Sequence, residues 1–172
     1  MEEKIYTVRW GIVLAVLTIL FGFALGALMG GAEPQIKEYW QSLAQPGLVS
    51  IYHNDPQKIT EIVNRSWKML QRAHMHAAAI GTAVLILMFV LAQLRTKILY
   101  KQIGSVLLGL GGLGYSLSWF LVAFQAPVVG DIRAVKAGIH LLAAPSIGML
   151  LLGTMIVLFL GIKMLFDKKS AA

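Results

Sequence analysis

Four apolar segments alternate with short polar connections along the chain. They cover about residues 10–30, 73–94, 103–124 and 137–162. A helix needs about 20 predominantly apolar residues to cross the hydrocarbon core of a bilayer, and each segment meets that length. The pattern predicts an all-α integral membrane four-helix bundle, built as a single membrane domain over residues 1–172.

The one long connection covers residues 31–64. Pro34 suits a helix start, and apolar side chains then recur on one face until Pro46, so we expect a short interfacial helix in this first outer loop. Asp55 and Pro56 fit the cap and first residue of the next helix. That helix is about twice as long as the hydrocarbon core is thick, which places its first turns outside the membrane.

Composition supports a membrane protein. The 172 residues are 58% hydrophobic and only 13% charged, roughly half the charged share of a soluble domain. The formal net charge of +7 comes from Lys and Arg in the gaps between apolar runs. This is typical of membrane flanks and does not indicate a nucleic-acid partner. The absence of cysteine excludes disulfides and thiolate-bound metals.

Basic residues are densest in the two terminal tails and in the turn at residues 95–101. By the positive-inside rule, both termini are expected to be cytoplasmic. We therefore expect a multi-pass protein of a bacterial or archaeal inner membrane. The lipid bilayer is its first partner.

Three histidines stand at the outer ends of spans. His74 and His76 begin the second span, and His140 begins the fourth. Ionisable groups at the edge of the hydrocarbon usually mark function. His74 and His76 are two residues apart, so at about 100° per residue they face nearly opposite sides of their helix.

A repeated spacing is the strongest chemical signal. Arg72 precedes His76 by four residues, and Lys136 precedes His140 by four. Each pair puts a cation one turn outward of an imidazole on the same helix face. This arrangement predicts a haem b whose iron takes both rings and whose propionates meet the two cations. Two aromatic side chains are expected at the edge of the haem: Trp67 and Trp119.

Other readings of the histidines remain open. His74, His76 and His140 could together hold copper or zinc, or could simply hydrogen-bond to carbonyls and headgroups. His74, which faces away from His76, could contact a quinone or ligate a second haem.

Two partial resemblances bear on this site. The run from His74 to Gly81, His-Met-His-Ala-Ala-Ala-Ile-Gly, resembles the His-x-His helix of haem-copper oxidase subunit I, which implies that His74 and His76 would serve haems on opposite faces. The four spans, the long first outer loop and the outer-end histidines are similar to one half of a haem A synthase. Ala73 and Ala77 stand where that family has a glutamate and an arginine, so the resemblance implies haem binding without the synthase activity.

The function expected from these features is that of a b-type cytochrome, which passes electrons between a quinol and a partner protein. No acid, base or nucleophile constellation is evident, so the cofactor would carry the chemistry. The alternative is a non-catalytic accessory subunit, held to a larger complex or to a second copy through the glycine faces of the first and third spans.

Overall fold

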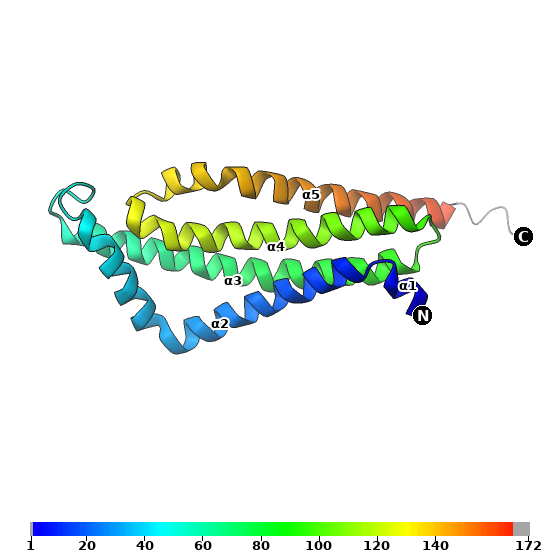
Figure 1. Cartoon of the computed structure of the whole chain (residues 1–172), viewed down its shortest axis with the longest axis horizontal. Helices are drawn as coiled ribbons and strands as arrows, with labels where there is room; N and C mark the ends of the chain where they lie inside the picture. Colours follow the sequence, from blue (N-terminus) through cyan, green and yellow to red (C-terminus); the bar gives the residue numbers. More distant parts are fainter. Residues whose placement is uncertain (1, 167–172) are drawn as a thin grey trace, which may run out of the picture.

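The protein is a set of long helices, as the computed structural model in Figure 1 shows. The structure describes residues 2–166, and no strand occurs within them. The elements in chain order are α1 (Glu2–Tyr6), α2 (Arg9–Ala44), the 3-10 turn η1 (Gln45–Gly47), α3 (Pro56–Gln93), α4 (Ile98–Val129) and α5 (Ile132–Phe166). Helices α2 to α5 are each long and apolar enough to cross a membrane, which confirms the all-α four-helix class.

Helix α4 is the centre of the arrangement. It packs on α2, α3 and α5, whereas α3 and α5 touch one another little. The start of α2 and the end of α5 lie at the same end of the molecule (Figure 1). Four crossings therefore return the chain to its starting side. The cytoplasmic location of that side stays a prediction, and Lys168 and Lys169 of the C-terminal tail lie outside the described residues.

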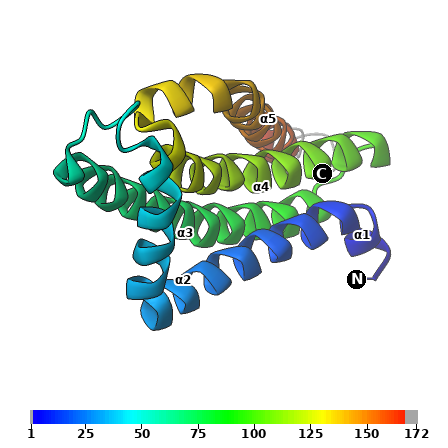
Figure 2. The ribbon, with the colours of Figure 1, turned by 60° about the vertical axis from the view of Figure 1, so that its left-hand side comes forward.

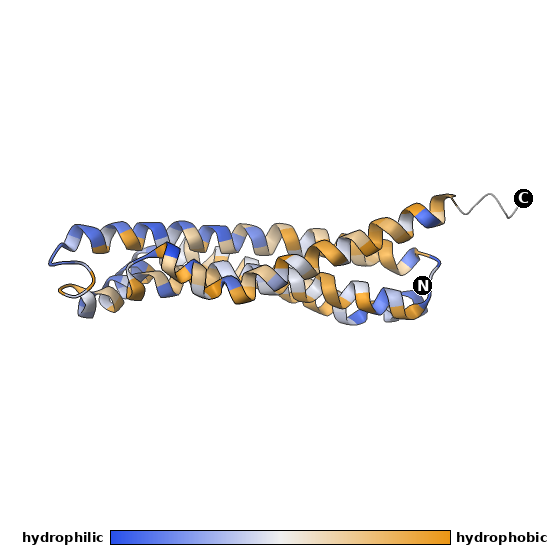
Figure 3. Cartoon of the chain, turned by 90° about the horizontal axis from the view of Figure 1, so that it is seen from above, coloured by the Kyte–Doolittle hydropathy of each residue, from blue (hydrophilic) through white to orange (hydrophobic). Residues whose placement is uncertain are grey.

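Helix α3 begins as the sequence predicts. The Asp55 carboxylate accepts a hydrogen bond from the Gln57 backbone N–H at 2.9 Å, and Pro56 is the first helical residue. Over its first four turns the helix is amphipathic, because Ile59 and Ile62 are buried while the charged side chains are exposed. Hydrophilic residues gather at this end of the molecule (Figure 3).

The short helix expected in the first loop is the second half of α2, and its place at the membrane interface stays a prediction. The two halves are joined across a kink at Ala32, whose φ of −136° and ψ of 25° leave the helical region. Pro34 follows within the first turn after the kink, where its missing N–H costs no hydrogen bond. The bend carries the second half of α2 back across α3 (Figure 2). Trp40 is fully buried there and meets Phe124 edge to face, with ring centroids 5.3 Å apart.

The outer turn between the last two helices is shorter than predicted. Pro127 was expected in that turn, but α4 continues through it to Val129. Gly130 ends the helix, because its φ of 75° is the left-handed conformation that glycine adopts without strain. Asp131 then accepts the Arg133 backbone N–H at 2.7 Å, so α5 starts five residues before the span predicted from residue 137.

Glycines let the helices approach closely inside the chain. A Cβ added at Gly22 of α2 would stand 2.8 Å from the Ala78 backbone nitrogen of α3, and one added at Gly111 of α4 would stand 2.7 Å from the Ser146 carbonyl oxygen of α5. Such distances require backbone movement. The glycine faces considered for a partner protein are thus largely occupied by neighbouring helices, although Gly30 has open space beside it.

Candidate functional site

His74 lies against α2. Its Nδ1 atom is 2.7 Å from the Gly22 carbonyl oxygen, and since a carbonyl only accepts hydrogen bonds, Nδ1 carries the proton. The ring also fills the space beside Gly26, where an added Cβ would stand 2.8 Å from the His74 Cε1 atom. The ring therefore belongs to the α2–α3 packing. A second haem on His74 would require α2 to move away.

His76 lies on a different side of α3, against α4. Its ring centroid is 5.5 Å from that of Tyr115 and 5.6 Å from that of Trp119. Its Nδ1 atom donates to the Arg72 carbonyl oxygen at 2.8 Å, which leaves the Nε2 atom of the neutral ring with a lone pair. A histidine held by a carbonyl at one nitrogen is the usual state of a metal ligand that binds through the other nitrogen.

The two cations of the repeated spacing meet on Trp119. The Arg72 Cζ atom lies 5.3 Å from the centroid of the indole ring, and the Lys136 Nζ atom lies 4.9 Å from it. They come from α3 and α5, while Trp119 belongs to α4. The indole Nε1 atom is buried and has no hydrogen-bond partner within residues 2–166. The structure thus brings four predicted site residues together: Arg72, His76, Trp119 and Lys136.

His140 and Trp67 stand outside this group. His140 is exposed on α5, and it makes no hydrogen bond or aromatic contact within the part of the chain that the structure describes. It does not touch His76. Trp67 is buried toward α2, with its ring centroid 6.3 Å from that of Trp40 and 5.3 Å from the Lys37 Nζ atom.

A three-histidine copper or zinc site is not assembled. No group of three or more metal-ligating His, Asp or Glu side chains occurs among the described residues. His74 and His76 turn to different helices, as their spacing predicts, so they cannot share one ion with His140.

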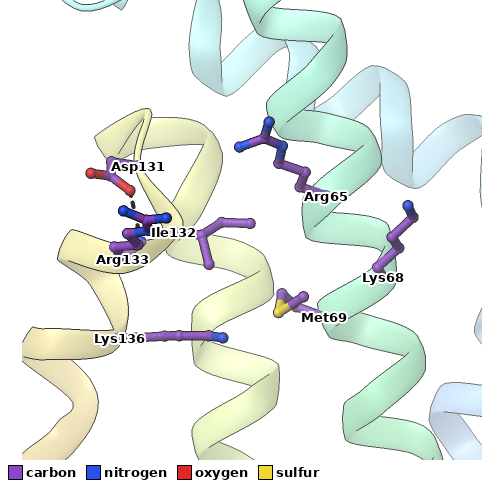
Figure 4. A pocket seen from close by; sticks show the side chains of 7 residues that line it. All are labelled: Arg65, Lys68, Met69, Asp131, Ile132, Arg133 and Lys136. Atoms are coloured by element: carbon purple, nitrogen blue, oxygen red, sulfur yellow. Dashed lines mark hydrogen bonds between the residues drawn. The ribbon is translucent and has the colours of Figure 1, made fainter.

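Sequence reasoning missed a basic cleft outward of Trp119. Its volume is about 490 Å³, and it opens between the outer half of α3 and the start of α5 (Figure 4). Seven residues line it: Arg65, Lys68, Met69, Asp131, Ile132, Arg133 and Lys136. The spacing of the cations on each helix was a readable signal, because residues three apart share a helix face. The predicted fourth span begins only at residue 137, so Arg133 was not expected to lie on a helix with Lys136.

The comparisons with known proteins give no relative for this arrangement. No family model matches the sequence, and neither the curated proteins nor the solved structures yield a match. The assignment of function therefore depends on the residues themselves.

Proposed function

We propose that this protein is a haem b-binding membrane electron-transfer protein, with His76 as an iron ligand in the group formed by α3, α4 and α5. The observation that carries the proposal is the convergence of two cations on Trp119, beside a histidine whose Nδ1 proton is already engaged.

The cations favour an anionic ligand. Neither Arg72 nor Lys136 makes a salt bridge in the described residues, where the pairs found are Lys37 with Glu33 and Arg65 with Glu61. Two unpaired positive charges near one ring repel one another, and the bound carboxylates of a haem would remove that cost. The aromatic side chains beside His76 supply an apolar wall for the macrocycle.

His140 is the second residue that would hold the haem iron. It lies one turn inward of Lys136, as His76 lies one turn inward of Arg72, and α3 and α5 run in the same direction. The two helices make few direct contacts with one another because both pack on α4, so the macrocycle would lie over the α4 side chains between them. Because His140 is exposed, its ring has rotamer freedom to turn toward the iron.

When bound, the haem would supply one-electron chemistry at its iron. The chain would hold the ring through the two imidazoles and anchor the propionates at the outer face. A quinol dissolved in the bilayer is the electron donor class we propose, with a partner protein as the acceptor.

The test is the visible spectrum of protein purified in detergent from haem-sufficient cells. The proposal expects red protein with the reduced-minus-oxidised spectrum of low-spin haem. His76→Ala and His140→Ala should each abolish that spectrum, because a six-coordinate iron needs both rings. His74→Ala is the matched control and should retain it, since this ring faces α2.

Colourless protein that also fails to take up added hemin would leave a non-catalytic accessory subunit as the better reading. Loss of the low-spin spectrum in His74→Ala, with His76→Ala unaffected, would exchange the roles of the two rings.

A further inference from the structure

The basic cleft has an unbalanced charge. Four of its seven lining side chains are cationic, and a single one is acidic. That acidic residue, Asp131, already caps the start of α5 by accepting the Arg133 backbone N–H at 2.7 Å. The ion pair found for a cleft cation in the described residues joins Arg65 to Glu61 at 3.7 Å, with both side chains about two-thirds exposed. Exposed pairs of this kind hold their partners weakly.

The shape of the cleft suits a small anion with an apolar body. Lys136 points from α5 toward α3, and Met69 and Ile132 lie between the two walls (Figure 4). Met69 and Ile132 thus give the cleft an apolar floor, and cationic side chains line it from both helices. An arginine can hold two phosphate oxygens at once, and a lysine adds a point charge, so the lining fits a phosphate group better than a single carboxylate.

The depth of the cleft matches the headgroup layer. Lys68 precedes the predicted second span by five residues, which is about 7 Å at 1.5 Å per residue. Lys136 directly precedes the predicted fourth span. The polar layer on each side of the hydrocarbon core is roughly 5–7 Å thick. On these predicted bounds, Lys68 and Lys136 lie at the depth of the layer that holds lipid phosphates.

We propose that this cleft binds a phosphate group, and that the headgroup of an anionic phospholipid is its natural source. The phosphate would lie between Lys68 and Arg65 of α3 and Arg133 of α5, with the acyl chains following the exposed apolar face of α5. Such a lipid would tie together two helices that otherwise touch little. Of the four cleft cations, Lys136 alone is also assigned to haem binding. The lipid proposal and the haem proposal can therefore fail independently.

The experiment uses full-length protein in detergent, delipidated and titrated with phosphatidylglycerol or phosphatidylcholine, with bound lipid counted by native mass spectrometry. The test variant is Lys68→Gln with Arg133→Gln. The matched control is Arg95→Gln with Lys97→Gln, which removes the same charge from exposed positions in the α3–α4 turn at the other end. A parallel arm adds inorganic phosphate at millimolar concentration as a competitor.

The expected result is selective retention of phosphatidylglycerol, weakened about 25-fold in the test variant and unchanged in the control, since each of the two basic residues near a membrane surface is worth about a fivefold change in affinity. Binding of inorganic phosphate with the same dependence on Lys68 and Arg133, but no lipid retention, would keep the phosphate site and make its source soluble. Equal loss of bound phosphatidylglycerol in the test and control variants would overturn the proposal. So would equal retention of phosphatidylglycerol and phosphatidylcholine without binding of inorganic phosphate. Circular dichroism of both variants checks that they fold.

Discussion

At the scale of single residues, the partner of the Nδ1 atom distinguishes His74 from His76. His74 donates to the Gly22 carbonyl of another helix, and so it joins α3 to α2. His76 donates to the Arg72 carbonyl of its own helix, so its ring orientation is fixed while its Nε2 atom stays available. Two imidazoles two residues apart thus have different chemistry available to them, because one faces helix backbone and the other faces aromatic side chains and cations.

Tyr52 offers a test at this scale. It is 2% exposed, its hydroxyl donates to the Pro127 carbonyl, and burial raises its pKa above the usual value of 10.0. Tyr52→Phe leaves that carbonyl unpaired and should lower the free energy of unfolding by about 1 kcal/mol at neutral pH. Thermal unfolding followed by the fluorescence of the nearby tryptophans measures it. Tyr39→Phe, at a 54% exposed position, is the control.

The raised pKa of Tyr52 also predicts how the stability of the same variants changes with pH. The folded state holds the Tyr52 proton more tightly than the unfolded state does, so its contribution is intact below about pH 10, the unfolded pKa. It is lost as the pH rises through the higher folded pKa. Wild-type protein and Tyr39→Phe should therefore lose stability above pH 10 more steeply than Tyr52→Phe does. If stability falls equally with pH in all three proteins, the Tyr52 hydroxyl is not buried as the structure shows.

At the scale of elements, the hydrophobic pattern predicted the four helices but not where they bend or stop. The ends differ from the prediction in two places: α2 continues beyond a kink at Ala32, and Gly130, rather than Pro127, ends α4. Pro127 lacks the N–H that would donate to the Ala123 carbonyl, yet α4 continues for two more residues, so a proline near a helix end does not by itself mark the last residue. Lys101 belongs to the predicted basic turn at residues 95–101, and its side chain is buried and donates to the Ala92 carbonyl at 2.8 Å.

The crossing of α4 and α5 can be tested by adding one methyl group. A Cβ at Gly111 would stand 2.7 Å from the Leu150 backbone nitrogen, so Gly111→Ala must push α5 away. We expect a loss of about 1–3 kcal/mol in the free energy of unfolding in detergent, as for other overpacked contacts. Gly148→Ala on α5 meets nothing within 4 Å and should be neutral or gain up to about 1 kcal/mol from helix propensity. If both variants melt alike, α5 does not pack on α4 through this contact.

At the scale of the whole molecule, the sequence pattern did not predict which helices pack against one another. Helix α5 is apolar on nearly every face: Val135 is 4% exposed and Leu141 is 86% exposed, yet hydrophobicity does not separate them. In a bilayer, apolar side chains are equally stable against lipid and against protein. Small residues and polar groups therefore determine which helix faces pack together. The cations on Trp119 were predictable by spacing on each helix. Their meeting on one ring was not, because it depends on α4 lying between α3 and α5.

The same scale holds the last prediction, the orientation in the membrane. The start of α2 and the end of α5 lie on one side of the molecule (Figure 1), and the density of Lys and Arg predicts that this side is cytoplasmic. The chain has no cysteine, so a single introduced cysteine is the sole thiol. In intact cells, an impermeant maleimide should label Gln45→Cys, which is exposed in the outer loop, and should label Thr96→Cys only after the membrane is permeabilised. Labelling of Thr96→Cys without permeabilisation, and not of Gln45→Cys, would invert the protein and move His76, Trp119 and the basic cleft to the cytoplasmic face.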